Sequence, residues 1–322
     1  MSRNFLVAPD SFKGTFDAAA VADAIAAGIE AAGGEVDRCP VADGGEGTMA
    51  VLLRALGGER RSARVHDPLR RPIEASFALL GDGETAIVEA AQASGLPLLA
   101  PQERDPERAD TFGTGELIAA AVAAGAKRVL LAAGGSATTD GGRGAIEALR
   151  QSDAAEGIEV LCDVRTPYEE AARVFAPQKG ASPAAVERMT EKLDAFAAEL
   201  PRDPRGLPMT GAAGGLSGGL WAHGATLRPG ADFVLDALDF DARLARADAV
   251  VSGEGRFDSQ SLEGKIVGAI ASRCAAAGKP LHLIVGQNGL RKESPASISS
   301  VIAASSLEEI ETVGGELCRA RA

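Results

Sequence analysis

The sequence predicts an α/β protein with two domains. Short apolar runs without alternation end abruptly in glycine, aspartate or proline, which is typical of buried strands in a parallel sheet. Alanine-rich segments with apolar residues at helical spacing lie between these runs. Residues 64–90 instead alternate apolar and polar side chains, as an antiparallel hairpin does, so a second domain with a mixed sheet is expected to begin near them.

Four runs are predicted to be strands of parallel sheets. They are "FLVAPD" (5–10), "VLLAAGG" (129–135), "AVVSGEG" (249–255) and "LHLIVGQ" (281–287). Ligands of such sheets bind outside the carboxyl ends of the strands. The glycine and acidic residues that end these runs are therefore candidates for a binding site.

The helices and the hairpin follow from the spacing of apolar residues. Residues 15–34 predict a helix with Thr15 as its N-cap and Gly33 and Gly34 as its stop signal. Residues 181–200 predict a second, amphipathic helix. In the hairpin the apolar face is formed by Ile73, Ala75, Phe77 and Leu79, and the chain is expected to turn at Asp82 and Gly83.

Composition excludes several classes of partner. The chain of 322 residues carries a formal net charge of −12 and no cluster of basic residues, so nucleic acid and anionic membranes would repel it. The longest apolar tract, residues 117–126, is too short to cross a bilayer, and the N-terminus lacks the pattern of a signal peptide. We therefore expect a cytoplasmic protein with no membrane or nucleic-acid partner.

Cysteine and histidine offer little material for a site. The cysteines Cys39, Cys162, Cys274 and Cys318 are dispersed and form no C-x-x-C pair, so neither a zinc site nor a disulfide scaffold is indicated. The three histidines lie far apart in the sequence, which disfavours a histidine metal site and a Ser-His-Asp triad. Catalysis is expected to depend on carboxylates, lysines and backbone groups.

Seven glycine-rich segments punctuate the chain, and "GGSATTDGG" (134–142) is the densest of them. It follows a predicted strand, where glycines let backbone N–H groups approach phosphate oxygens. The alternative for any one segment is an ordinary flexible turn. Neither the G-x-x-x-x-G-K-[ST] nor the full G-x-G-x-x-G fingerprint is present, so a Walker-type or dinucleotide-binding assignment has no support.

Three lysines stand beside glycines in these segments: Lys13, Lys179 and Lys265. The chain has seven lysines against 26 arginines, so lysine is scarce where any cation would do. An ammonium group is the usual point-charge partner for a phosphate oxygen. The alternative is a solvated surface lysine next to a turn.

Acidic residues also concentrate in these segments. They are Asp10, Asp43, Glu46, Asp140, Glu254 and Asp258, and most of them follow predicted strands. Carboxylates there are able to hold magnesium at nucleotide phosphates or to accept a proton from an attacking hydroxyl. Asp43 and Asp140 have the alternative of initiating turns or capping helices.

Eight segments, taken in order, resemble the signature blocks of the bacterial glycerate kinase family. They are "APDSFKG", "PVADGGEGT", "VEAAQASGL", "GTGEL", "GGSATTDGG", "FAPQKGA", "GAAGGL" and "GEGRFDSQSLEGK". The resemblance implies ATP- and Mg²⁺-dependent phosphorylation of D-glycerate, with 2-phosphoglycerate favoured over 3-phosphoglycerate as product. It also implies a Rossmann-like parallel α/β domain and a mixed α/β domain, with the active site in the cleft between them.

The expected domains are a discontinuous Rossmann-like domain of residues 1–65 and 235–322 and an inserted domain of residues 66–234. Asp10, Lys13, Asp258 and Lys179 are the expected catalytic residues, and Asp43, Glu46 and Asp140 the expected metal ligands. Nucleotide binding is assigned to Gly134, Gly135, Ser136, Thr138, Gly141, Gly113, Gly115, Gly253 and Gly255. Substrate binding is assigned to Ser11, Arg256, Asp163 and Gly45. The expected partners are a small hydroxy-acid and ATP, with a homodimer left open.

The sequence departs from the family pattern at three places. Thr139 stands where the family usually has asparagine, residues 162–170 change the neighbours of Asp163, and the connection over residues 150–157 is short. These differences leave open another small hydroxy-acid as the substrate. A nicotinamide-dependent reductase for such an acid is a second alternative, although its fingerprint is missing.

Overall fold

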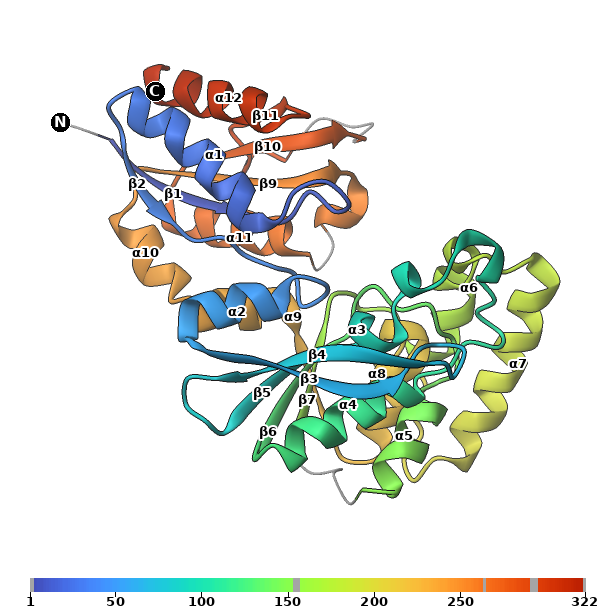
Figure 1. The fold of residues 1–322 in the computed structure, drawn as a ribbon. Coiled ribbons are helices and arrows are strands. Elements are labelled where there is room, and N and C mark those ends of the chain that lie inside the picture. Colours follow the sequence, from blue (N-terminus) through green and yellow to red (C-terminus); the bar gives the residue numbers. More distant parts are fainter. Residues whose placement is uncertain (1–2, 153–156, 263–264, 290–294, 321–322) are drawn as a thin grey trace. The chain divides into compact units, whose positions relative to one another are not determined.

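The computed structural model describes residues 3–152, 157–262, 265–289 and 295–320. The chain divides into two compact units, which Figure 1 shows coloured along the sequence. Unit 1 contains residues 1–43 and 231–322, and unit 2 contains residues 44–230. No helix within the described residues is long and apolar enough to span a membrane.

Unit 1 is built on a five-stranded sheet in which every pair of neighbouring strands is parallel. Its strands are β1 (Asn4–Pro9), β2 (Glu35–Arg38), β9 (Ala249–Phe257), β10 (Leu281–Asn288) and β11 (Ser300–Ala303), in the order β11-β10-β9-β1-β2. Read from the other edge, this is the 2-1-3-4-5 order of a doubly wound sheet. The strand order reverses between β1 and β9, where such folds place their ligands.

Helices cover both faces of this sheet. They are α1 (Ala18–Ala31), α9 (Gly230–Ala237), α10 (Phe240–Arg246), α11 (Ile266–Ala277), α12 (Leu307–Arg319) and the 3₁₀ helix η6 (Ser259–Leu262). Helices α1 and α12 lie side by side on one face, and a core of apolar residues from them packs on β1, β9 and β10. The spacing of Val21, Ile25 and Ile29 buries all three in that core, as the sequence predicts.

Unit 2 contains a mixed six-stranded sheet in the order β3-β4-β5-β6-β7-β8. Its strands are β3 (Gly58–His66), β4 (Pro72–Leu80), β5 (Thr85–Glu89), β6 (Arg128–Ala132), β7 (Ile158–Cys162) and β8 (Thr226–Pro229). The pairs β3-β4 and β4-β5 are antiparallel, and the later pairs are parallel. The carboxyl ends of β5, β6 and β7 therefore lie at the same end of the sheet.

The α-helices of unit 2 are α2 (Thr48–Leu56), α3 (Ala91–Ser94), α4 (Phe112–Ala123), α5 (Arg143–Arg150), α6 (Ala171–Phe175), α7 (Pro183–Glu199) and α8 (Leu216–Ala222). Its 3₁₀ helices are η1 (Leu96–Leu98), η2 (Pro101–Glu103), η3 (Tyr168–Glu170), η4 (Pro177–Lys179) and η5 (Ala212–Gly215). Side chains of α4, α5 and α8 pack with the sheet in the main core. A smaller core around Tyr168 joins α6 and α7.

The predicted α/β class, the four parallel strands and the hairpin are confirmed. The first helix starts later than expected, because Asp17 rather than Thr15 is its N-cap and accepts a hydrogen bond from the Ala20 N–H. The division of the chain also differs from the expected boundaries. Residue 66 belongs to β3, which pairs along its length with β4, so the chain divides at 43/44 and 230/231 instead.

Candidate functional site

Each unit has its own polar pocket at the carboxyl ends of its strands. We call them the Asp10 pocket of unit 1 and the Lys179 pocket of unit 2. The Asp10 pocket has a volume of about 410 Å³ and the Lys179 pocket about 330 Å³. Both are large enough for a small metabolite or part of a nucleotide.

The Lys179 pocket lies beyond β6 and β7. Six predicted site residues line it: Glu46, Gly134, Gly135, Ser136, Asp163 and Lys179. Its apolar wall was not predicted and is formed mainly by Leu96, Pro97, Val164, Phe175 and Ala213. Figure 1 shows the strands and helices of this unit from which these residues come.

Two glycines form the floor of the Lys179 pocket. A Cβ atom on Gly134 would lie 2.7 Å from the Gly45 Cα and 3.2 Å from the Asp163 Oδ2. Gly135 has a φ of +77°, and a Cβ there would come within 3.5 Å of the Glu46 Oε2. Bare backbone is therefore needed where the two carboxylates approach this loop.

Lys179 is the buried cation of this pocket. Its side chain is only 4% exposed, and its Nζ donates hydrogen bonds to the Ser136 Oγ at 3.1 Å and to the Thr138 carbonyl at 2.6 Å. Burial lowers the pKa of Lys179 to about 7, against the opposing effect of Asp140 and Asp163. Thr138 thus contributes through its backbone, and its buried hydroxyl has no hydrogen-bond partner among the described residues.

Glu89 positions the loop that carries Glu46. Its carboxylate accepts hydrogen bonds from the Gly47 and Met49 N–H groups at 2.9 and 2.8 Å, at the start of α2. Glu89 is buried at the end of β5, which raises its pKa. The sequence pattern does not single out Glu89, because its hydrogen-bond partners lie about forty positions away in the chain.

The Asp10 pocket lies where the strand order of unit 1 reverses, beyond β1 and β9. Its predicted residues are Asp10, Ser11, Lys13, Asp43, Gly255, Arg256 and Asp258. Glu254, Lys265 and Gln287 also line it. The seven predicted residues come from three distant segments, so the fold brings together what the sequence separates.

Asp10 is a buried acid of this pocket, at 5% exposure. Its backbone N–H donates to the Gly253 carbonyl at 2.8 Å, and its Oδ1 accepts from the Ser11 N–H at 2.6 Å. Burial and then the nearby Asp43 raise the pKa of Asp10 well above the ordinary aspartate value. A carboxyl group with a pKa near the working pH has the property required of a general acid or base.

Glu254 is a second buried acid in the same pocket. It is 8% exposed, and its Oε1 has no hydrogen-bond partner among the described residues. Burial raises the pKa of Glu254 to about 7. The sequence contained a signal for it, since Glu254 stands between two glycines in a glycine-rich segment, but it was not assigned a role.

Cations stand beside these acids. The Lys13 Nζ lies 3.5 Å from the Asp43 Oδ2, and the Lys13 side chain is 53% exposed. The Arg256 Nε lies 3.4 Å from the Asp258 Oδ2 at the rim. The Asp10 pocket therefore combines buried carboxyl groups with accessible cations, which suits it to an anionic ligand that carries a hydroxyl group.

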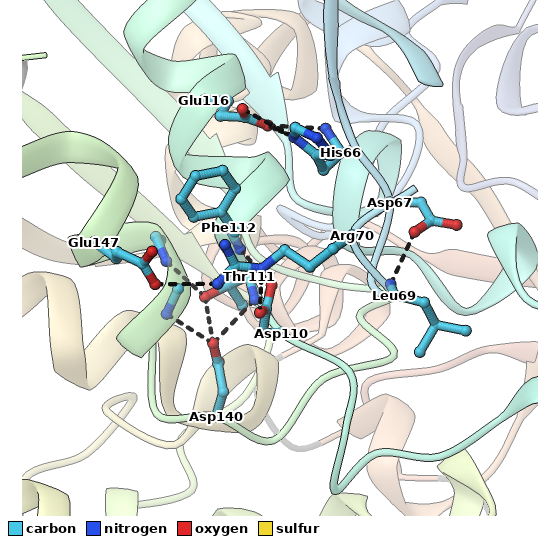
Figure 2. A network of polar contacts seen from close by, with 12 residues as sticks. His66, Asp67, Leu69, Arg70, Asp110, Thr111, Phe112, Glu116, Asp140 and Glu147 are labelled. Carbon is cyan, nitrogen blue, oxygen red and sulfur yellow. Dashed lines mark hydrogen bonds and ion pairs between the residues drawn. The ribbon is translucent and has the colours of Figure 1, made fainter. Parts of the chain in front are cut away.

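Asp140 lies in a different environment from the one predicted. Figure 2 shows its carboxylate turned toward Thr111, whose N–H and Oγ1 donate to the Asp140 Oδ2. Its oxygens accept four hydrogen bonds, from the Thr111 N–H and Oγ1 and from the Gly142 and Gly144 N–H groups. We therefore propose that Asp140 anchors the loop before α5 rather than binding metal, which is the alternative that the sequence left open.

Ion pairs around Asp140 reinforce this anchor. Arg70 bonds Asp110 and Glu147 and lies 3.9 Å from the centre of the Phe112 ring (Figure 2). His66 contacts Glu116 at 2.9 Å in the same view. The network ties the β3-β4 turn to the start of α4 and to α5.

Four of the glycines predicted to bind nucleotide stand where neighbouring atoms leave no room for a side chain. A Cβ on Gly113 would meet the His66 carbonyl at 1.7 Å, and one on Gly115 the Ala145 carbonyl at 2.5 Å. A Cβ on Gly141 would clash with the Tyr168 hydroxyl at 2.1 Å, and one on Gly253 with the Ile284 carbonyl at 2.1 Å. None of the four lines either pocket.

The three expected metal ligands are divided between the two units, with Asp43 in unit 1 and Glu46 and Asp140 in unit 2. Asp43 lines the Asp10 pocket, Glu46 lines the Lys179 pocket, and Asp140 lines neither. Within the described parts of the chain, no three histidine, cysteine, aspartate or glutamate side chains are grouped so that they could hold a metal ion. Any magnesium is therefore expected to share its ligands with a bound phosphate group.

Comparisons with known proteins agree on one family. The chain matches the model of the glycerate kinase family over residues 5–157 and 150–314. It is 38% identical to the glycerate kinase of Bacillus subtilis (strain 168), covering 87% of this chain and 84% of that protein. It is 36% identical to the glycerate 2-kinase of Escherichia coli (strain K12), with the same coverage.

A solved structure shares the fold. The crystal structure of a Salmonella typhimurium LT2 protein, provisionally named glycerate kinase 2, superimposes with a TM-score of 0.81. The two sequences are 33% identical, and the match covers 99% of this chain and 98% of that one. The two segments that match the family model overlap in residues 150–157, which form the connection that is short in this sequence. Residues 153–156 of this connection lie outside the described residues.

Proposed function

This chain belongs to the glycerate kinase family and is a phosphotransferase, and we propose that it transfers the γ-phosphoryl group of ATP to D-glycerate. The observation that best supports the chemistry is the pair of polar pockets. One offers a buried lysine beside a glycine loop, and the other offers buried carboxyl groups beside cations. We propose the 2-hydroxyl of glycerate as the acceptor and the cytoplasm as the compartment.

The Lys179 pocket is proposed to receive the phosphates of ATP. Backbone at Gly134 and Gly135 allows close approach of phosphate oxygens, and Ser136 and Lys179 supply hydrogen-bond donors beside it. The apolar wall around Leu96 and Phe175 suits part of the nucleoside. Positioning and charge stabilisation of this kind account for most of the catalysis of phosphoryl transfer.

The Asp10 pocket is proposed to receive D-glycerate. Arg256, which is exposed at the rim, is the proposed partner of the glycerate carboxylate. Asp10 is the proposed acceptor of the hydroxyl proton, and Lys13 the cation that stabilises the charge developing on the phosphoryl group. Asp258, at the Arg256 rim, keeps Arg256 oriented in this proposal.

The residues present fit a magnesium ion that arrives with the nucleotide. Mg²⁺ is usually bound by one or two carboxylates together with substrate phosphates, so a three-residue cluster is not required. Glu46 is exposed in the Lys179 pocket, and its Oε2 lies beside the space that a side chain on Gly135 would fill. Glu46 is thus the proposed magnesium ligand in the Lys179 pocket, and Asp43 is the proposed magnesium ligand in the Asp10 pocket. A bound magnesium ion would neutralise negative charge on the phosphates.

The test is ADP release by purified protein with Mg²⁺ and ATP. D-Glycerate should elicit ADP, whereas L-lactate and glycerol should not, because the site is expected to need both a carboxylate and the diol. NMR spectroscopy of the product distinguishes 2-phosphoglycerate from 3-phosphoglycerate. Equal turnover of glycerol would refute the hydroxy-acid assignment, and turnover of a different hydroxy-acid alone would point to the departures at Thr139 and residues 162–170.

A further inference from the structure

Lys179 is a buried side chain whose Nζ makes two hydrogen bonds, one fewer than an ammonium group is able to donate. Its Nζ donates to the Ser136 Oγ and the Thr138 carbonyl. A neutral amine has two N–H groups, whereas an ammonium has three. No carboxylate within the described residues lies at ion-pair distance from Lys179, so the third position of the nitrogen is not used by an acid of the protein.

The acidic groups around Lys179 would neutralise a positive charge on its Nζ only in part. Asp140 and Asp163 act on it at longer range, and Glu46 lies across the same pocket. The Asp140 oxygens are already engaged by four other donors. The backbone of Arg104, a further cationic residue, packs against Gly180, which follows Lys179 in the chain.

Burial without a paired acid disfavours the ammonium form, and the pKa of Lys179 is lowered to about 7 accordingly. Near neutral pH, the unliganded protein therefore contains a substantial fraction of neutral Lys179. A negatively charged ligand group in the pocket would reverse the balance, since an opposite charge within a few ångströms favours the charged form.

We propose that the Lys179 pocket binds an anionic group of a substrate, and that Lys179 takes up a proton as this group binds. The proposal deepens the proposed function and rests on it, because the anion is either a nucleotide phosphate or the glycerate carboxylate. The proton comes from solvent, and its uptake creates the ammonium that pairs with the anion. Ligand affinity is then constant below about pH 7 and falls by up to tenfold per pH unit above it.

A different role for Lys179 predicts the opposite dependence on pH. If neutral Lys179 accepted the proton of the reacting hydroxyl, turnover would rise through pH 7 as the free amine forms. Ligand binding would then take up no proton. The two roles are therefore separated by the binding step alone, without reference to turnover.

Calorimetric titration with magnesium-free ADP at pH 8, in two buffers of different ionisation enthalpy, measures the protons taken up. The wild-type protein should take up close to one proton, about 0.9 for a group with a pKa of about 7. Lys179→Met should take up none and should bind ADP more weakly. Lys179→Arg, which is charged at every accessible pH, should also take up none.

Lys13→Met is the matched control, because Lys13 lines the other pocket, is half exposed and is already paired with Asp43. It should retain the wild-type proton uptake on ADP. D-Glycerate is titrated in the same way, and uptake with glycerate instead of ADP would support the coupling and identify the carboxylate as the anion.

Binding of ADP and of D-glycerate by the wild type with proton uptake for neither ligand would refute the inference while leaving the proposed function intact. Equal uptake by Lys179→Met would also refute it. Melting curves of each variant check that the fold is retained. If neither ADP nor D-glycerate bound the folded wild-type protein, the proposed function would fail, and this inference with it.

Discussion

Asp140→Asn separates the structural role of this residue from the metal-binding role that the sequence predicts. Asparagine is nearly isosteric with aspartate, but it has one acceptor oxygen and no charge. Its oxygen can keep the position that accepts from Thr111 and Gly144, and its NH₂ group then faces the Gly142 N–H. One hydrogen bond is lost, and a donor is left facing another donor.

The cost follows from these contacts. Losing a hydrogen bond to a charged group, together with weakening the others, amounts to about 2–4 kcal/mol. For a domain of the size of unit 2, this lowers the melting temperature by roughly 4–16 °C. Turnover at 25 °C with saturating Mg²⁺ and ATP should stay within about fivefold of wild type, because the carboxylate lines neither pocket.

Differential scanning calorimetry and ADP release measure the two effects. Asp82→Asn is the matched control, since Asp82 likewise accepts from the Glu84 and Thr85 N–H groups, but in an exposed turn that lines neither pocket. Its cost should stay below about 1 kcal/mol. An unchanged melting temperature for Asp140→Asn with a loss of turnover on the order of a hundredfold would refute our reassignment and restore Asp140 as a metal ligand.

Three further substitutions test the pockets and the core. Lys13→Met should lower turnover at least about tenfold and move the melting temperature by less than about 2 °C, because the Lys13 side chain is half exposed. The control is Lys127→Met, at an exposed surface pair with Glu84, which should change neither turnover nor the melting temperature. Wild-type kinetics for Lys13→Met would place Lys13 outside the site. Asp10→Asn should abolish turnover. Because the pKa of Asp10 is raised, the folded wild type retains a proton that the unfolded chain releases, so the stability of the wild type falls as pH rises. Asp10→Asn lacks this proton and should become progressively more stable than wild type between about pH 4 and pH 8. A stability difference that does not depend on pH would contradict this. Tyr168→Phe should raise the melting temperature by a few degrees, because the buried Tyr168 hydroxyl has no hydrogen-bond partner among the described residues; a fall would show that the hydroxyl is satisfied in solution.

Local sequence determined the elements of the fold. The apolar runs at 5–10, 129–135, 249–255 and 281–287 are β1, β6, β9 and β10, because a buried parallel strand needs uninterrupted apolar residues. The hairpin at residues 72–89 was readable from its alternation. The scarcity of lysine drew attention to Lys13 and Lys179, and the structure places each in a pocket.

Tertiary structure alone decided which of these residues meet. Asp140 looks like a metal ligand or a cap in sequence, and only the approach of Thr111, 29 positions earlier, engages its carboxylate. Gly113 and Gly115 look like a phosphate loop, yet their missing side chains admit the His66 and Ala145 carbonyls. Glu254 acquires its buried position in the Asp10 pocket only because β9 pairs with β1.

The physical reason is the range of the interactions involved. Strand and helix signals depend on neighbours within a few residues, and those neighbours are fixed by the covalent chain. Hydrogen-bond partners, burial and pKa depend on groups that folding brings to within a few ångströms from anywhere in the sequence. The sequence therefore determined the strands, the loops and the residue types available to a site. The packed structure decided which glycines line a pocket and which only pack against neighbouring backbone, and which carboxylates anchor a loop and which face a pocket.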